Sequence, residues 1–399
     1  MELFGQIVIY IIMACAVVGC IASIVKEDSE LGNQFLEGIN SIGSIFLPVA
    51  GIMASAPYLT WFVSKVFGPT FGLLGADQAM AATTFIAVDM GGYQLAQALA
   101  QTKESWIMAM ITGYMAGATI VFSIPVALKM LQKSDRRYLA MGAMVGFVTI
   151  PIGVFISSVI IALSHPMIRE TIATNGEATY QLALSLGTIL HNLLPLVIIC
   201  GLIAVGLYFI PEKMISAFNI FGKCMDTVLR IVFVLCVVEY FTAVFSTVLG
   251  HWGFEPIIAD ESDINRALEI SGYIGIMLCG AFPMVWLIKR YLAKPLDWLS
   301  RYVGLSADAS AGILAGTANV LALFGMVKDL QPEDKVKCIA YSVCSAFLIG
   351  DHLAFAANFQ PTLIFPIMAG KFIAGCAAVY IATLFMKRGV LKIDGKNNG

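Results

Sequence analysis

The stretch FGLLGADQAMAATTFIAVDMGGYQLAQALA, from Phe71 to Ala100, decides how the rest of the chain is interpreted. It is apolar enough to lie in a membrane, yet it contains the two carboxylates Asp77 and Asp89. An aspartate in the middle of a membrane costs at least about 2.5 kcal/mol on insertion scales, so it is seldom kept there without a partner or a function. The glycine pair Gly91-Gly92 that follows Asp89 is expected to loosen the helix and let a substrate approach the backbone. The stretch therefore predicts a transport pathway built around this segment and a second one like it.

The composition of the whole chain is that of a polytopic membrane protein. Of its 399 residues, 59% are hydrophobic and 13% are charged, whereas soluble domains carry about 25% charged residues. The net charge of −2 gives no electrostatic footprint for nucleic acid. The nine cysteines are scattered without a Cys-x-x-Cys pair, which favours buried free thiols over a disulfide framework or a metal site. We expect an all-α integral protein of the lipid bilayer with no cofactor, no metal, no catalytic residues and no nucleic-acid partner; a homo-oligomer is left open.

Eleven apolar segments follow one another along the chain, and no soluble domain lies between them. Their approximate bounds are 7–25, 41–64, 71–101, 105–128, 138–164, 185–210, 229–250, 270–288, 303–327, 338–357 and 361–386. Segments of this length predict about ten to eleven transmembrane helices in a single transport domain over residues 1–399. The first segment is preceded by Glu2 rather than by basic residues, which favours a retained helix over a signal peptide.

The orientation in the membrane follows from where lysine and arginine collect. They are concentrated in residues 129–137, in residues 289–301 and in the C-terminal tail, so these parts are expected to be cytoplasmic. Loops 26–37 and 251–269 are acidic and are expected to face outward. These assignments agree only if segment 303–327 enters and leaves on one side, as a re-entrant or broken helix. Both chain termini are then cytoplasmic.

A weak internal repeat relates two parts of the chain. Residues 37–72 overlay residues 269–304 without gaps, and one residue out of that register Asp77 falls on Asp308. Further on, Leu139-Ala140 falls on Ile339-Ala340, which leaves 105–128 as an extra segment in the first half. Pseudo-repeats of about 1–220 and 221–390, with interrupted segments at matching positions, are typical of transporters. Chance similarity between apolar helices is the alternative explanation.

Six polar side chains are candidates for binding a substrate. They are Asp89, Tyr93, Gln94, Asn319, Asp351 and His352. Asn319 falls within one position of Asp89 in the repeat overlay, and Asp351-His352 forms a second acidic position inside an apolar segment. Carboxylates supply charge, aromatic faces attract cations and amides form hydrogen bonds, so this set suits a small cationic substrate. The alternatives are an Asp89 paired only for packing and an Asp351-His352 pair near the membrane surface; the residues alone do not separate an ammonium group from Na⁺ or H⁺.

Other polar residues are assigned structural roles. Asp77 and Asp308 each precede alanine-rich sequence and are expected to cap the starts of half-helices. Lys371 lies midway through the last apolar segment, and is interpreted either as the counter-ion of Asp351 or Glu239 or as a side chain that extends to the membrane interface. Glycines spaced four apart, such as Gly113 and Gly117, are expected to let helices pack closely.

Six short stretches between about residues 85 and 370 resemble one family, the ethanolamine permease of the bacterial ethanolamine-utilisation system. They are Asp89–Gly92, Thr119–Leu128, Ser134–Ala140, Thr149–Gly153, Phe209–Ile215 and Gly350–Leu353. The resemblance implies an inner-membrane protein that admits ethanolamine for breakdown by a cobalamin-dependent lyase. With the cation-binding residues above, it leads us to expect facilitated diffusion of protonated ethanolamine.

Two other functions would use some of the same residues. An ion-coupled symporter of another small amine or amino acid predicts the same substrate contact at Asp89 and differs in needing Na⁺ or H⁺. An intramembrane aspartyl protease needs two carboxylates that share a proton, as Asp89 and Asp351 would have to do. Leu348 stands where such proteases have a glycine, which disfavours a protease.

Overall fold

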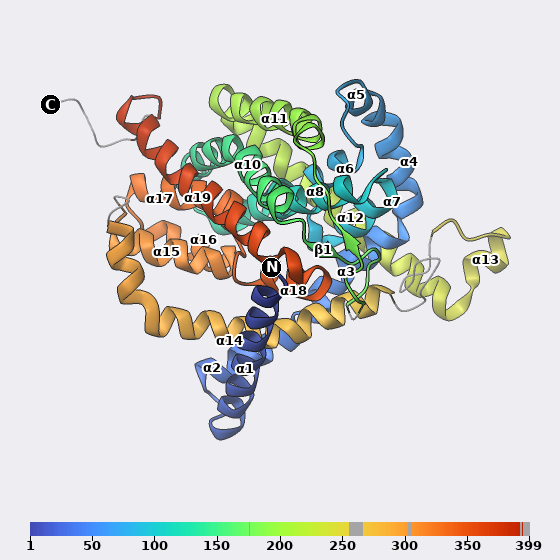
Figure 1. The fold of residues 1–399 in the computed structure, drawn as a ribbon, viewed down its shortest axis with the longest axis horizontal. Helices are drawn as coiled ribbons and strands as arrows, with labels where there is room; N and C mark the ends of the chain where they lie inside the picture. Colours follow the sequence, from blue (N-terminus) through green and yellow to red (C-terminus); the bar gives the residue numbers. More distant parts are fainter. Residues whose placement is uncertain (175, 255–265, 302–304, 392, 394–399) are drawn as a thin grey trace.

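The fold is almost entirely helical (Figure 1). The structure is a computed structural model that describes residues 1–174, 176–254, 266–301, 305–391 and 393; the side chains of 292–301 lie outside the description. The α-helices are α1 Glu2–Val25, α2 Glu30–Asn40, α3 Ile42–Ala54, α4 Ala56–Val66, α5 Gly68–Leu73, α6 Ala79–Phe85, α7 Gly92–Leu99, α8 Lys103–Thr112, α9 Ile124–Met130, α10 Arg136–Ser164, α11 Leu186–Phe209, α12 Pro211–Thr242, α13 Val244–Leu249, α14 Arg266–Arg301, α15 Ala307–Ala318, α16 Val320–Met326, α17 Pro332–Ser345, α18 Asp351–Phe359 and α19 Ile364–Lys387. Short 3₁₀ turns are η1 Val88–Met90, η3 Lys133–Asp135, η4 Val327–Asp329 and η5 Pro361–Leu363; η2 Gly113–Ser123 is a π-helix. The described strands, β1 Met167–Ile168 and β2 Tyr180–Gln181, pair antiparallel.

Seven helical stretches in the described ranges are long and apolar enough to cross a membrane. They are Glu2–Val25, Glu30–Ala54, Lys103–Met130, Lys133–Ser164, Leu186–Phe209, Arg266–Tyr291 and Pro361–Lys387. This confirms the predicted class, an all-α polytopic membrane protein. Several other apolar segments are interrupted, as the sequence predicted, so that shorter helices replace continuous spans.

The acidic segment 26–37 differs from the expected loop. Helix α2 already begins at Glu30, where Ser29 caps it by accepting a hydrogen bond from the N–H of Gly32 at 3.3 Å. Its residues Gly32 and Gly38 pack against neighbouring helices, because a Cβ at Gly38 would lie 2.4 Å from the backbone of Cys279. Polar residues of this segment therefore belong to a packed helix. Most of the other acidic loop, residues 255–265 of 251–269, lies outside the described residues.

Two loops define opposite ends of the molecule, which we call the basic end and the strand end. At the basic end, which contains Lys129–Arg137, the Lys335 Nζ atom lies 2.7 Å from Asp135 Oδ1. At the strand end, which contains residues 165–184, the backbone N–H of Arg169 donates to Gln360 Oε1 at 3.0 Å. Helix α10 joins the two ends in 29 residues, which at 1.5 Å per residue separates them by about 43 Å.

Two helical hairpins enter the molecule from these opposite ends (Figure 1). Hairpin 1, α6 with α7, has its base at the strand end: Gln78 at its start donates to Leu99 O at 3.4 Å, and Gln97 donates to Glu170 O at 3.2 Å. Hairpin 2, α15 with α16, has its base at the basic end, where Ser306 Oγ donates to Asp334 Oδ2 at 2.6 Å, next to Lys335. Hairpin 2 is segment 303–327, which therefore turns back, as the charge distribution required; its first residues, 303–304, lie outside the described chain.

Each hairpin is followed in the chain by a helix that runs to the other end and is interrupted halfway. The helix α8–η2–α9 contains the π-helical turn, and Gly117 within it packs against the tip of hairpin 1, since a Cβ there would lie 2.2 Å from Ile86 O. The helix α17–α18 is broken at residues 346–350. The backbone N–H groups of Phe347 and Ile349 in this break donate to Gly316 O and Thr317 O of hairpin 2 at 3.1 and 2.9 Å. Both hairpin tips thus meet in the middle of the protein.

Candidate functional site

A cavity of about 400 Å³ lies where the two hairpin tips meet. Four of the six predicted binding residues line it, and they come from three places in the chain: Asp89 from the tip of hairpin 1, Asn319 from the tip of hairpin 2, and Asp351 and His352 from the start of α18, directly after the break. The remaining walls come from α2, α3, the π-helix η2 and α14. Residues separated by more than 200 positions in the chain therefore share one site.

Asp89 reaches the cavity because the chain reverses direction beside it. Gly91 has a positive φ of 90°, which an L-residue rarely adopts, and a Cβ there would lie 2.6 Å from Ile52 Cβ. Gly92 is equally confined, because its Cβ would lie 2.5 Å from Ala87 O. These glycines therefore make the turn and its packing possible, and neither lines the cavity, in contrast to the expectation that they admit substrate to the backbone. Asp89 Oδ1 is buried and has no hydrogen-bond partner among the described residues.

Asp351 is presented by the second interruption. It is the first residue of α18, where the free N–H groups of a helix favour an anion. The preceding break contains Phe347 at a φ of 58°, a left-handed conformation that is unusual for a bulky side chain. Hydrogen bonds to hairpin 2 hold this backbone in place. The position of Asp351 therefore depends on the docking of hairpin 2.

His352 and Asn319 add neutral polar groups to the site. The His352 ring lies against the rings of Tyr114 and Phe347, with centroids 5.0 and 5.3 Å away, and its Nδ1 atom has no hydrogen-bond partner among the described residues. Asn319 Oδ1 accepts a hydrogen bond from the N–H of Leu321 at 2.9 Å and so caps α16. The Nδ2 amide of Asn319 remains available as a donor to a ligand.

Tyr93 and Gln94 do not line the cavity. Tyr93 is fully buried, stacks on Trp106 at 4.8 Å, and accepts a hydrogen bond from Gln360 Nε2 at 2.9 Å through its hydroxyl. Helix α7 turns this side chain toward α8 and the strand end, so the structure gives it a packing role. Neither amide atom of Gln94 has a hydrogen-bond partner in the described part of the chain, and nothing in the structure explains this.

The two expected capping aspartates have different outcomes. Asp77 Oδ1 accepts from the N–H of Ala79 at 2.9 Å, which confirms the cap of hairpin 1, and Oδ2 accepts from Gln101 at 2.8 Å, which closes its base. At hairpin 2 the prediction is wrong. Ser306 accepts from the N–H of Ala309 at 3.1 Å, and Asp308 is exposed in the first turn. Serine and aspartate both cap helices well, and the capping residue of α15 lies two residues earlier in the chain than we expected.

Lys371 pairs with neither of the predicted carboxylates. It is fully buried, and its Nζ atom donates to the backbone oxygen of Tyr114 in the π-helix η2 at 2.9 Å. It therefore does not extend to the membrane interface either. Glu239 instead accepts hydrogen bonds from Ser246 and Phe245 at the end of α12. The partner of Lys371 is a main-chain carbonyl, which the sequence does not reveal.

The cavity contains functional groups that sequence reasoning missed. Glu37 of α2 contributes a third carboxylate, and Phe122, Phe282 and Phe347 contribute aromatic faces. The only sequence signal for Glu37 was its place at the start of the repeat overlay. None of the described lining residues is a lysine or arginine, although three are carboxylates. Such a site attracts a cation, and the aromatic faces strengthen that attraction.

Comparison with known proteins gives one consistent result. Residues 4–385 match the family described as "Ethanolamine utilisation protein, EutH". The chain is 37% identical to the "Probable ethanolamine permease EutH" of Listeria monocytogenes, over 99% of both chains. It is 38% identical to the proteins of the same name from Salmonella typhimurium and Escherichia coli, over 91% of this chain and 87% of theirs. No solved structure matches the chain. The chain therefore belongs to the EutH family of ethanolamine utilisation proteins.

Proposed function

We propose that this protein carries protonated ethanolamine across the bacterial inner membrane and that the cavity between the hairpin tips is its binding site. The observation that supports this most strongly is the charge of the cavity, which has the carboxylates of Glu37, Asp89 and Asp351 and no lysine or arginine among its described lining residues. The relatives are named as ethanolamine permeases, which indicates ethanolamine as the substrate and favours a transporter over an enzyme.

Each part of the substrate has a matching group in the site. The ammonium group is a donor that the unpartnered Asp89 Oδ1 can accept from. The hydroxyl oxygen can accept from Asn319 Nδ2, whose own oxygen is already bonded within the hairpin. Because Asp89 and Asn319 lie on hairpins that enter from opposite ends, movement of either tip would open the cavity toward one end only. This arrangement suits alternating access by two inverted repeats.

Uptake by the purified protein in liposomes tests the transport mode. We expect labelled ethanolamine to equilibrate across the membrane without an ion gradient, and to be recovered chemically unchanged. Accumulation above the outside concentration that requires a Na⁺ or H⁺ gradient would establish coupled symport instead. Liposomes without protein, assayed at the same pH, measure the leak of neutral substrate.

The growth of a strain that lacks this protein should depend on external pH. A primary amine titrates near the lysine value of about 10.4 or somewhat below it, and each pH unit of acidification cuts the neutral fraction about tenfold. Only the neutral form crosses lipid readily, because a charged ammonium must be desolvated. We expect the deletion strain to grow on scarce ethanolamine at high pH and to fail at mildly acidic pH. Equal impairment at every pH would contradict facilitated uptake of the protonated amine.

The basic end is proposed to face the cytoplasm, together with residues 389–391, which line a pocket with Arg137. In a variant without the nine native cysteines, a cysteine at Pro332 should resist an impermeant thiol reagent added outside, and so should one at Asp297. A cysteine at the exposed Thr171 of the strand end should react. If the cysteine at Pro332 reacted and the one at Thr171 were protected, the protein would have the opposite orientation. If both reacted, the basic end and the strand end would not lie on opposite sides of the membrane.

The same labelling experiment decides the side of the N-terminus, which the charge distribution placed in the cytoplasm. Helix α1 begins against η5, where a Cβ at Gly5 would lie 2.3 Å from Pro361 O. Pro361 follows Gln360, which contacts Arg169 of the strand end, so the start of α1 lies at the strand end, whereas residues 389–391 lie at the basic end. This geometry favours opposite sides for the two ends of the chain, in contrast to the expectation that both are cytoplasmic. A cysteine at the exposed Leu3 reports whether the N-terminus shares the side of Pro332 or that of Thr171.

A further inference from the structure

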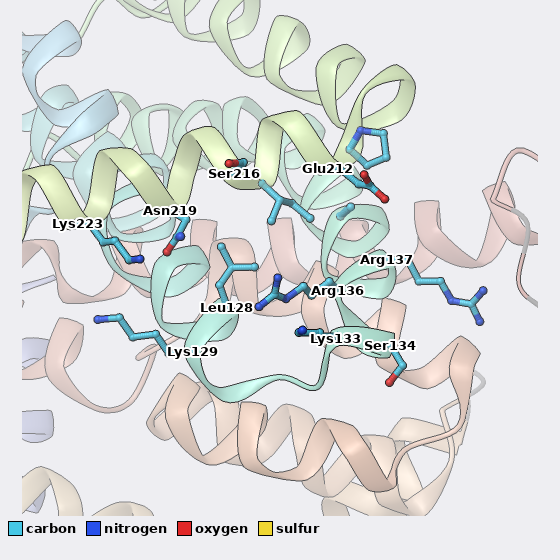
Figure 2. Close-up of a pocket in the computed structure, with 13 residues that line it drawn as sticks. Leu128, Lys129, Lys133, Ser134, Arg136, Arg137, Glu212, Ser216, Asn219 and Lys223 are labelled. Carbon is cyan, nitrogen blue, oxygen red and sulfur yellow. The ribbon is translucent and has the colours of Figure 1, made fainter.

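A second, larger cavity lies at the basic end. It has a volume of about 910 Å³ and lies between residues 128–140 and the first turns of α12 (Figure 2). We call it the basic pocket. Its lining includes Lys129, Lys133, Arg136 and Lys223. None of the residues that line the cavity between the hairpin tips also lines the basic pocket. The two cavities therefore have opposite charge and separate walls.

The positive charge of the basic pocket is not neutralised by nearby acids. Lys129, Lys133, Arg136 and Lys223 are exposed and form no ion pair with a described residue. Asp135, which lies in the same loop, is buried and paired with Lys335 at 2.7 Å. Glu212 is the only acid among the described lining residues, and Figure 2 shows it at the opposite edge of the pocket from Lys129 and Lys223.

The remaining lining groups define the shape of a ligand that would fit. Ser216 and Asn219 of α12 offer neutral hydrogen-bonding groups on one side of the pocket, and Figure 2 shows Arg136 extending into the space that α12 covers. The side chains of Leu128 and Ile215 supply an apolar wall. Arginine and lysine surrounded by hydroxyl and amide donors are the usual partners of a phosphate group.

We propose that the basic pocket binds a phosphate group, with Lys129, Lys133, Arg136 and Lys223 as its cationic contacts. Two sources offer this chemistry at a membrane surface: the headgroup of an anionic phospholipid and a soluble phosphate. The lipid headgroup matches the surroundings, because the pocket lies along α12 of a membrane protein, whose neighbouring Ile220 is 65% exposed. Basic pockets between membrane helices commonly hold such headgroups.

Thermal unfolding of the purified full-length protein tests the proposal with three probes. The protein in neutral detergent receives mixed micelles that contain phosphatidylglycerol, mixed micelles that contain phosphatidylcholine, or inorganic phosphate. The test variant is Arg136→Gln with Lys223→Gln, which removes one cation from each wall, and a second variant, Lys129→Gln with Lys133→Gln, removes two cations from residues 128–140. The control is Lys213→Gln, which removes an exposed charge from the same helix outside the pocket.

We expect phosphatidylglycerol, and not phosphatidylcholine, to raise the unfolding temperature of the wild type and of Lys213→Gln. Each double variant should need about 30-fold more phosphatidylglycerol for the same shift, because it loses two cations. If inorganic phosphate gives a shift with the same variant dependence and the lipid does not, the pocket binds a soluble phosphate. The proposal is overturned if neither phosphate probe stabilises the wild type, or if the double variants respond to the probes as the wild type does.

Discussion

Replacing Asp89 with asparagine is expected to weaken ethanolamine binding by about 10- to 150-fold. The variant keeps the shape of the side chain and removes the charge that would meet the ammonium group, and the loss of a charge-assisted hydrogen bond costs about 1.5–3 kcal/mol. Folding should survive, because the buried Oδ1 atom has no partner among the described residues and its carboxylate was itself costly to bury. The measurement is ethanolamine uptake as a function of concentration, at matched expression.

Asp308→Asn is the matched control for this substitution. Asp308 is an exposed aspartate on hairpin 2, outside the cavity, so the control removes the same charge from the other hairpin. We expect its uptake to equal that of the wild type. Normal uptake by a well-expressed Asp89→Asn protein would remove Asp89 from the binding site, and equal losses in both variants would point to a general effect of charge.

Replacing Gly350 with alanine is expected to abolish transport through a purely steric effect. The added methyl group would lie 2.1 Å from Ala318 O at the tip of hairpin 2, a distance at which the backbone must move. The tip would then separate from the break that holds Asp351, and Asn319 would move with it. Overpacking of this kind typically costs about 1–3 kcal/mol of stability, so part of the protein should remain folded for an uptake assay.

Gly325→Ala provides the control on the same hairpin. Gly325 lies in α16 with no atom within 4 Å of its Cβ position, and alanine is favoured over glycine within a helix by up to about 1 kcal/mol. Its transport should be unchanged, and its unfolding temperature unchanged or higher. If Gly350→Ala transported normally, the docking of hairpin 2 on the break would not matter for function.

The overlay of the two halves is a prediction from the sequence, and the structure agrees with part of its alignment and differs from the rest. The overlay placed Asp77 on Asp308 and Asn319 next to Asp89, and these pairs do lie at the starts and tips of two hairpins. Beyond residue 100 the overlay pairs α10 with α17 and treats 105–128 as an extra segment. The order of elements indicates a different pairing, in which α8–α9 corresponds to α17–α18 and α10 to α19. Apolar helices resemble one another in composition, so a gap in the sequence overlay is easily assigned to the wrong helix.

The sequence by itself determined the class of the protein and the two acidic positions at its centre. Long apolar runs and the cost of burying a charge are properties of local composition, and they single out Asp89 and Asp351 without any knowledge of neighbours. Tertiary structure alone decided which side chains face the cavity. Tyr93 is four residues from Asp89 and packs against Trp106, whereas Glu37, assigned to a loop, lines the site. Lys371 bonds to a main-chain carbonyl that every residue possesses. The physical reason is that the direction of a side chain depends on which helices pack around it, and that packing joins residues hundreds of positions apart.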